Sequence, residues 1–319
     1  MIVRDLRRQD IPAIVQGLTE NFPRENALQG WDPTHVEGVL RRVVGFPVGW
    51  IWAFLRGIHR SPVRFLVAVE DADVAGTTLV FLSPGYAYLA MVMTLNRFRR
   101  RGVGRALLTE AERTARRRHR SHCLLDVLRD NLPARQLYES RGYRPLRQLS
   151  WLVRDLPPEG APKGPFPEIR PFTSADVPGV LSLKRGIEPP EVREVLEPRP
   201  ENVAPSSTVQ SLLGSRSAGW CTGPLGRPRA YVGATISSFF QAGQLGLPLF
   251  SCQASEEERR QLIGTALEWL RALGIGRVIA EVPHYARGSR EALEGAGFGP
   301  GLELDTLVLP LRNRDHAPP

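Results

Sequence analysis

The chain has 319 residues, a length that predicts two domains, each large enough to bury its own hydrophobic core. Hydrophobic residues make up 42% of the chain and charged residues 24%, which excludes both a disordered chain and a membrane-embedded one. The formal net charge is +9, and every lysine or arginine except Lys163 and Lys184 is an arginine. Because such a bias alone does not identify a nucleic-acid-binding protein, the positions of the arginines matter more than their number.

The N-terminal residues lack the apolar core of a signal peptide, and the most apolar stretch, residues 46–58, is too short to span a bilayer. We expect residues 46–58 to form a buried or substrate-facing helix. The three cysteines, Cys123, Cys221 and Cys252, lack the spacing of a zinc site and the density of a disulfide framework. We therefore expect structural thiols, no metal, no membrane partner and a cytoplasmic location.

The chain divides near its midpoint, where residues 157–167 are rich in proline and glycine and predict a linker. The two halves begin alike. A short strand, at Ile2–Leu6 or Ile169–Phe172, runs into a helix with a proline in its first turn. Asp10 in the first half, and Ser174 or Asp176 in the second, are the expected helix N-caps. We expect domains at 1–156 and 168–312, the linker at 157–167 and a tail at 313–319.

In the first half, periodicity and turn residues predict strands over 65–69, 74–80, 86–94, 123–128 and 143–153, and helices over 106–118 and 133–140. In the second half they predict strands over 230–238, 244–252, 277–282 and 298–309, and helices over 256–273 and 288–294. The shared order indicates a duplicated domain. The expected fold class is α/β, of the mixed α+β type: two tandem domains, each a mostly antiparallel mixed sheet flanked by helices.

The strongest motif is the run Arg-Arg-Arg-Gly-Val-Gly-Arg at residues 99–105, between the strand ending at Thr94 and a helix. A helix N-terminus suits an anion, and Gly102 and Gly104 allow the backbone to approach a phosphate closely. No Gly-Lys-Ser/Thr follows, which excludes a Walker A motif, and Leu107 replaces the third glycine of a dinucleotide fingerprint. The alternative is that both glycines only shape a tight turn.

On these residues the chain resembles the GNAT superfamily of acyl-CoA-dependent N-acyltransferases, whose pyrophosphate loop reads Gln/Arg-x-x-Gly-x-Gly/Ala. Arg99, Gly102 and Gly104 match that loop. Residues 131–143 match the Asn-x-x-Ala-x-x-Leu-Tyr-Glu-x-x-Gly-Phe/Tyr string of bacterial N-terminal-amine acetyltransferases. The resemblance covers most of residues 1–156. It implies direct transfer of an acetyl group from acetyl-CoA to a primary amine in a ternary complex.

The resemblance also implies a role for individual residues. Tyr138 would be the general acid that protonates the departing thiolate, and Asp126 stands where some relatives carry a catalytic glutamate. The alternative for Tyr138 is a role in packing, and the alternative for Asp126 is a structural role. Glu25 or Glu37 is then the alternative general base. Asn131 would bind the pantetheine arm. The expected cofactor-binding set is Val92, Met93, Thr94, Arg99, Arg100, Arg101, Gly102, Val103, Gly104, Arg105, Asn131 and Arg135.

Ten arginines fall between Arg97 and Arg120, opposed only by Glu110 and Glu112. Those beyond the first helical turn are too far along the helix to reach a pyrophosphate. They would receive the 3′-phosphate of CoA, form a solvated face or bind nucleic acid. Because the chain lacks interleaved aromatic residues and a recognised nucleic-acid module, we favour the first two.

The second half departs from the loop motif. Leu262 stands where the first half has Gly102, and Leu293 stands where it has Tyr138. Glutamates at 256–258 open the helix, where they stabilise it but repel a pyrophosphate. We therefore expect a degenerate copy that shapes the acceptor pocket or stabilises the first domain.

The sequence leaves the acceptor open between a small-molecule amine and a peptide amine. Residues 21–60 contain Trp31, Trp50, Trp52 and Phe54, which predict an aromatic-lined acceptor pocket, with packing as the alternative. Besides acetyl-CoA, we expect the acceptor to be the only partner. We expect the protein to be a monomer or a homodimer. A non-catalytic acyl-CoA-binding sensor or interaction protein is the alternative function.

Overall fold

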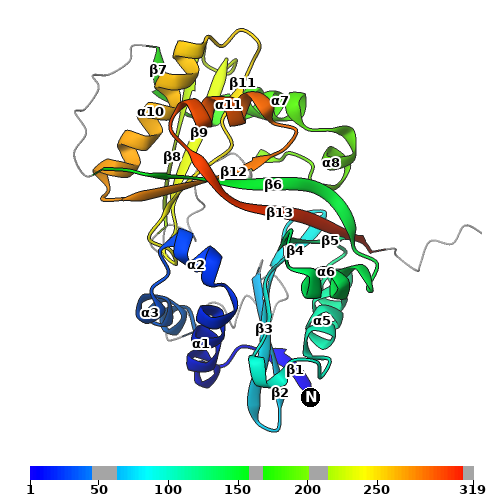
Figure 1. Cartoon of the computed structure of the whole chain (residues 1–319). Coiled ribbons are helices and arrows are strands. Elements are labelled where there is room, and N and C mark those ends of the chain that lie inside the picture. The colour runs from blue at the N-terminus through cyan, green and yellow to red at the C-terminus, as the bar shows by residue number, and fades with distance from the viewer. Residues whose placement is uncertain (45–62, 158–167, 201–214, 312–319) are drawn as a thin grey trace, which may run out of the picture. The chain divides into compact units, whose positions relative to one another are not determined.

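The computed structural model describes residues 1–44, 63–157, 168–200 and 215–311 (Figure 1). The apolar stretch 46–58, all of the expected linker except Pro157, and the tail 313–319 lie outside these residues. Contacts divide the chain into two compact units. Unit 1 comprises Met1–Arg24, Asp32–Arg147 and Leu304–Pro319, and unit 2 comprises Glu25–Trp31 and Gln148–Glu303.

Unit 1 is built on a mixed sheet. Its strands lie in the order β1 (Ile2–Asp5), β2 (Val63–Glu70), β3 (Asp73–Leu82), β4 (Tyr86–Thr94), β5 (His122–Leu128) and β13 (Gly299–Pro310). The neighbouring strands are antiparallel except for β4 and β5, which are parallel. Its helices are α1 (Ile11–Asn21), α3 (Pro33–Val44), α5 (Val103–Arg117) and α6 (Leu132–Glu139).

Helices α1 and α5 cover opposite faces of this sheet (Figure 1). Small residues allow both helices to approach the strands closely. A Cβ added to Gly76 of β3 would lie 2.9 Å from Cγ1 of Val103 in α5, and one added to Gly17 of α1 would lie 2.9 Å from Cε of Met93. The inner face of α5 is apolar at helical spacing, with Val103, Leu107, Leu108, Ala111 and Ala115 buried.

Unit 2 repeats this strand order. Its strands run β7 (Ile169–Pro171), β8 (Arg216–Thr222), β9 (Ala230–Ile236), β10 (Gly243–Leu245), β12 (Arg277–Pro283) and β6 (Arg144–Asp155), and β11 (Leu249–Phe250) also pairs with β9. As in unit 1, the fourth and fifth strands are the parallel pair. Its helices are α7 (Val177–Ile187), α8 (Pro190–Val195), α10 (Glu256–Ala272) and α11 (Arg287–Gly295), and α2 (Pro23–Gln29) lies mostly within it. The predicted tandem α/β fold is confirmed.

Each unit takes its last strand from the other half of the sequence. The C-terminal strand β13 pairs with β5 of unit 1, with Thr306 opposite Asp126. Strand β6 pairs with β12 of unit 2, with Trp151 opposite Glu281. The units therefore differ from the sequence bounds 1–156 and 168–312 in their last strands. A hydrophobic pattern predicts that a strand forms but not which of two equivalent sheet edges it joins.

The predicted strand over 244–252 is divided in the structure into β10 and β11. Gly246 and Pro248 lie in the break, and Pro248 has no N–H to donate to a strand ladder. Strand β8, which the sequence analysis missed, completes the pairing of β9 on its other side.

An arginine–aspartate pair is repeated at the start of both units. Arg4 contacts both carboxylate oxygens of Asp10, at 2.6 and 2.9 Å, and Arg170 contacts both oxygens of Asp176, at 2.8 and 2.8 Å. Both aspartates are buried. The pair joins the first strand of each unit to the turn that begins its first helix, so the duplication extends to side-chain contacts.

Both aspartates occupy the N-cap position of their helix, as predicted, but their carboxylates do not cap it. Each instead accepts a hydrogen bond from a backbone N–H three residues earlier, that of Arg7 at 2.7 Å or Thr173 at 3.0 Å. The carboxylates therefore close the preceding 3-10 turn.

Replacement of Asp176 by Asn should destabilise unit 2 by about 3 kcal/mol at pH 7, because it leaves the Arg170 guanidinium without its buried partner. Arg170, with the backbone N–H groups of Gly226 and Thr173, holds the pKa of Asp176 below its ordinary value. A lowered pKa contributes stability above the unfolded pKa, about 4, and this stability is lost as the pH falls below it. The difference from wild type should therefore shrink towards pH 3.

Urea unfolding at both pH values measures this effect. Asp155→Asn is the matched control, because Asp155 forms an exposed pair with Arg277 at 2.6 Å and should contribute less than about 1 kcal/mol. Equal losses in the two variants would show that burial does not govern the strength of the Asp176 pair.

Candidate functional site

In unit 1 the backbone pairing between β4 and β5 ends halfway along β4. The parallel ladder runs from Tyr86 opposite His122 to Leu89 opposite Leu125. Beyond that point β4 stays paired with β3 as far as Thr94, and β5 stays paired with β13 as far as Leu128. Among the described residues, no strand pairs with β4 on the side of β5 from Met91 to Thr94, so this part of the edge is available for hydrogen bonds to a ligand. Val92, Met93 and Thr94, predicted from the sequence, lie along this edge.

A β-bulge lies where the two strands part. Between the pairs Thr77–Met93 and Leu79–Ala90, β4 contains one residue more than β3, and Met91 has a φ of 52°. A bulge bends its strand and re-aims the neighbouring backbone groups. Here it separates the part of β4 that pairs with β5 from the part that does not.

The N-terminus of α5 lies at the end of this open edge, after the loop 95–102. Its N-cap, Gly102, has a φ of 83°, and no side chain caps the helix. The first turn of α5 contains no acidic residue. Since the first N–H groups of a helix have no acceptor within it, this end of α5 is suited to an anion.

The arginines of the loop are exposed and differ in their contacts. Arg99 donates to Oδ1 of Asn21 at 2.9 Å, and Arg101 lies 3.8 Å from Glu70. Among the residues that the structure describes, Arg100 and Arg105 form no recorded ion pair, and both are exposed. These two guanidinium groups are therefore the cations best placed to meet an anion at α5.

Further along α5, acidic residues neutralise part of the basic run. Glu110 pairs with Arg113 and with Arg117, each at 2.7 Å. Glu112 is buried and pairs with Arg141, which follows α6, at 2.6 Å. This part of the helix contains ion pairs within the fold, which fits the prediction of a solvated face.

Tyr138 lies on α6 and is 5% exposed. Its ring packs beside that of Tyr143, with centroids 6.0 Å apart. Burial raises the pKa of Tyr138 above its ordinary value of about 10, so the phenol stays protonated at neutral pH. The side chain combines the predicted packing role with the protonation state of an acid.

Asn131 and Arg135 already have partners within unit 1. The Asn131 side chain caps α6 by accepting from the N–H of Ala134 at 3.3 Å. Arg135 forms an ion pair with Asp305 of β13, which is 6% exposed. Arg135 thus joins α6 to the C-terminal strand, a role that the sequence analysis did not include.

Asp126 is half-buried and lies one residue beyond the last pair of the β4–β5 ladder. Its Oδ2 accepts from the Tyr88 hydroxyl at 2.8 Å, and its Oδ1 accepts from the Thr306 hydroxyl at 2.6 Å. Tyr88 and Thr306 were not predicted. Thr306 is 180 residues from Asp126 in the chain, and no local sequence signal connects the two.

The other residues predicted for the acceptor side belong to different parts of the chain. Glu37 forms an ion pair with Arg41 at 2.6 Å, and Glu25 lies on α2 in unit 2. Trp31 also belongs to unit 2, where its ring lies 6.3 Å from that of Phe240. Trp50, Trp52 and Phe54 lie outside the described residues.

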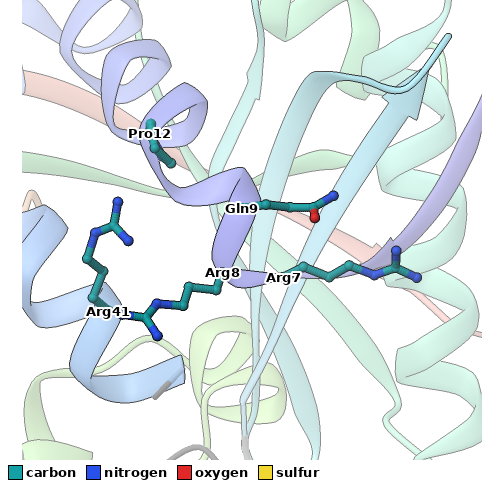
Figure 2. Close-up of a pocket in the computed structure, with 5 residues that line it drawn as sticks. All are labelled: Arg7, Arg8, Gln9, Pro12 and Arg41. Carbon is teal, nitrogen blue, oxygen red and sulfur yellow. The ribbon is translucent and has the colours of Figure 1, made fainter.

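An open depression lies at the start of α1, lined by Arg7, Arg8, Gln9, Pro12 and Arg41 (Figure 2). Figure 2 shows the side chains of Arg8 and Arg41 near each other and that of Arg7 directed away. None of the residues predicted for the site lines this depression.

Two cysteines are buried in the sheets, one in each unit. Burial raises the pKa of the thiols of Cys123 and Cys221 to about 12, which makes both poor nucleophiles. Across the described ranges, no group of three or more His, Cys, Asp or Glu side chains has the arrangement of a metal site. Among these same residues, no helix has both the length and the apolar character of a membrane span.

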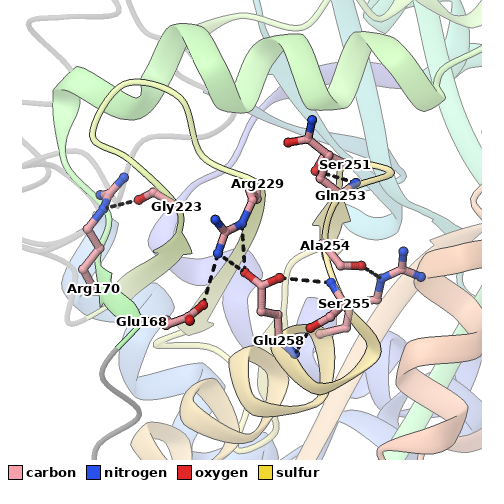
Figure 3. Close-up of polar contacts among 10 residues, drawn as sticks. Glu168, Arg170, Gly223, Arg229, Ser251, Gln253, Ala254, Ser255 and Glu258 are labelled. Carbon is pink, nitrogen blue, oxygen red and sulfur yellow. Dashed lines mark hydrogen bonds and ion pairs between the residues drawn. The ribbon is translucent and has the colours of Figure 1, made fainter.

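The N-terminus of α10, the corresponding helix of unit 2, is capped by side chains of the protein (Figure 3). Ser255 and Glu258 cap each other: the Ser255 hydroxyl accepts from the Glu258 N–H at 3.1 Å, and the Glu258 carboxylate accepts from the Ser255 N–H at 3.0 Å. Arg229 donates to the same carboxylate at 2.7 Å. Burial opposes ionisation of Glu258, but these contacts outweigh it and hold its pKa below its usual range.

A side chain of unit 2 also bonds to the segment between β10 and β11. Ser289 of α11 is buried, and its hydroxyl donates to the carbonyl of Pro248 at 2.6 Å. The bond joins α11 directly to the segment between β10 and β11. In unit 2, side chains of the protein therefore bond to the helix N-terminus and to the interrupted strand. In unit 1, the helix N-terminus has no side-chain cap, and β4 keeps an edge that is available to a ligand.

Comparison with known proteins gives a family match for part of the chain. Residues 31–143 match the acetyltransferase (GNAT) family model, a range that includes β4, the α5 loop, Asp126 and Tyr138. A search of curated proteins returned no match.

Among solved structures, the chain is similar to a tandem GNAT protein from the clavulanic acid biosynthesis pathway. The identity is 15% and the TM-score 0.62, covering 98% of this chain and 99% of that one. It is also similar to a GCN5-related N-acetyltransferase from Sphaerobacter thermophilus, with 18% identity, a TM-score of 0.61 and coverage of 98% and 96%. Both likenesses concern the fold, and they extend over both units.

Two glycines should respond oppositely to alanine. Gly102→Ala should lower the free energy of unfolding by about 1 kcal/mol, because its φ of 83° strains any residue that has a Cβ. Gly264→Ala, inside α10 with nothing within 4 Å of an added Cβ, should raise it by about 0.5–1 kcal/mol. Denaturant midpoints compare the two variants, and a stabilising effect at Gly102 would contradict the conformational reason for this glycine.

Proposed function

Because this chain carries a GNAT acetyltransferase-family domain within a tandem GNAT fold, we propose that it transfers the acetyl group of acetyl-CoA to a primary amine and that unit 1 is the active copy. The proposal rests most on one contrast. The N-terminus of α5 has no side-chain cap, whereas the N-terminus of α10 is occupied by the carboxylate of Glu258. A carboxylate in that place excludes a second anion by charge and by volume.

The residues of unit 1 fit the parts of acetyl-CoA. The pyrophosphate would bind the N–H groups at the start of α5, with Arg100 and Arg105 as counter-charges. The pantetheine amides would pair with the open edge of β4 between Met91 and Thr94, as an additional strand would. When bound, acetyl-CoA supplies a thioester carbonyl that an amine can attack.

Two side chains would move protons in this reaction. Tyr138 would protonate the departing sulfur, a role that requires a phenol protonated at the working pH, and its raised pKa meets that requirement. Asp126 would accept a proton from the amine, since an α-amino group titrates near 8 and a lysine near 10. A backbone N–H on the open edge of β4 would stabilise the negative charge that develops on the carbonyl oxygen.

Release of free thiol from acetyl-CoA, followed against a panel of small primary amines and amino-terminal peptides, tests the proposed activity. Amine-dependent thiol release with formation of an N-acetylated product is the expected result. Calorimetric binding of CoA with no turnover on any amine would contradict catalysis and favour an acyl-CoA sensor.

Tyr138→Phe should lower kcat by about 10²-fold or more, because general acid catalysis typically contributes a factor of that size. The affinity for acetyl-CoA should change little, since the phenyl ring keeps its packing against Tyr143. Steady-state kinetics and calorimetry measure the two quantities, with Tyr231→Phe in unit 2 as the control for loss of a half-buried phenol. An unchanged kcat would remove Tyr138 from the mechanism.

A further inference from the structure

A chain of side-chain hydrogen bonds crosses four strands next to the point where β4 and β5 part. Nε of Arg147 on β6 donates to the Thr306 hydroxyl at 3.2 Å, and that hydroxyl donates to Oδ1 of Asp126 at 2.6 Å. From the other side, the Tyr88 hydroxyl donates to Oδ2 of Asp126 at 2.8 Å. All four residues belong to unit 1.

This arrangement fixes the direction of the Asp126 carboxylate. Each oxygen accepts one bond from a hydroxyl, and an ionised carboxylate has about four acceptor sites, so it retains acceptor capacity. Thr306 is 1% exposed, and its hydroxyl proton is directed to Asp126 because Arg147 already donates to its oxygen. Neither donor is a cation that would neutralise the carboxylate by an ion pair.

The carboxylate is also accessible from the open edge. Asp126 is half-buried, and the next residue back, Leu125, forms the last pair with β4. Tyr88 lies beside Phe81, with ring centroids 6.4 Å apart, and Phe81 is itself exposed. The face that carries Asp126 and Tyr88 is thus partly open to solvent and bordered by aromatic rings.

The same position in unit 2 has a different residue opposite the carboxylate. There the residue paired with Glu281, the counterpart of Asp126, is Trp151 rather than a threonine. An indole has one N–H donor and no hydroxyl, so it cannot relay a bond from an arginine to a carboxylate. Glu281 is exposed.

We propose that Thr306 and Tyr88 are positioning residues that hold the Asp126 carboxylate to bind the ammonium group of a cationic primary amine and to take up its proton. The inference rests on the proposed acetyl transfer. It makes the C-terminal strand β13 part of the active site, because Thr306 comes from that strand.

Each proton in the proposed transfer has a donor and an acceptor. The ammonium nitrogen gives one proton to Asp126, which passes it to solvent. The nitrogen then forms the N–C bond as the C–S bond breaks, and the sulfur keeps the electron pair of the broken bond. Tyr138 gives its proton to the sulfur, and the second proton lost by the nitrogen restores Tyr138.

Thr306→Val, which keeps the shape but removes the hydroxyl, tests the inference together with Thr306→Ser, which keeps the hydroxyl. The valine variant should lose about 10- to 100-fold in kcat/KM for the best amine of the panel, as expected for a lost hydrogen bond to a charged group. Acetyl-CoA affinity should be unchanged, and the serine variant should recover most of the activity. Thr114→Val is the control, because Thr114 is equally buried and accepts from Arg64 at 3.1 Å but lies on α5 rather than on a strand beside Asp126.

A second measurement does not depend on turnover. The ¹³C carboxyl signal of Asp126, identified by its loss in Asp126→Asn, should change its chemical shift at pH 7 in Thr306→Val, because Oδ1 loses the hydroxyl that donates to it. Tyr88→Phe should also change it, because Oδ2 then loses its donor. An unchanged chemical shift in Thr306→Val, or full activity in Asp126→Asn, would overturn the inference.

The two proposals can fail separately. A wild-type chain that binds CoA but acetylates nothing contradicts the proposed function, while a changed chemical shift of the Asp126 carboxyl in Thr306→Val would still support the positioning by Thr306. Active wild type with an unaffected Thr306→Val variant in both measurements overturns the inference and leaves the acetyl transfer standing.

Discussion

The unpaired N–H groups at the start of a helix need a partner, and the two copies of this fold meet that need differently. In unit 2 the partner is internal, because Ser255 and Glu258 cap α10 and Arg229 neutralises the carboxylate. In unit 1 the helix begins at Gly102 with no side-chain cap. The same difference recurs at the interrupted strand, where Ser289 bonds to Pro248 in unit 2 and β4 keeps an open edge in unit 1. One copy of the fold thus caps its helix with its own side chains, and the other copy leaves its helix without a side-chain cap.

The duplication is otherwise well preserved, which makes this difference informative. Both units begin with a bidentate arginine–aspartate pair, and both have a glycine with positive φ, Gly142 or Gly297, after the last helix. Those features serve folding in either copy. The features that differ lie at the helix N-terminus, the open strand edge and the position opposite Asp126, where a ligand would bind in unit 1.

Local sequence patterns predicted much of the fold. Helix α5, strand β5 and helix α6 lie within a few residues of their predicted bounds, because apolar periodicity and the flanking glycine and proline residues are local. The loop before α5 was predicted from its glycines, and in the structure the backbone of Gly102 lies in the left-handed region. The predicted N-cap aspartates were placed correctly, but their bonds to Arg4 and Arg170 were not foreseen, because the sequence does not show which way a side chain turns.

Long-range features were beyond the sequence pattern. Nothing in residues 299–310 indicates that this strand joins β5 rather than the equivalent β12, and with that choice come Thr306 beside Asp126 and Asp305 beside Arg135. The break between β10 and β11, at Gly246 and Pro248, was not predicted. Two residues of the site were also not predicted, and both contact Asp126 from other strands: Thr306 is 180 residues from it in the chain, and Tyr88 is 38 residues from it.

The number of CoA molecules that bind per chain, measured by calorimetric titration of the full chain, tests the contrast between the two copies most directly. The account predicts one site per chain, weakened severalfold by Arg105→Glu in α5 and unaffected by Arg260→Glu, an exposed arginine near the start of α10. Two sites per chain, or a single site weakened by Arg260→Glu and not by Arg105→Glu, would contradict it.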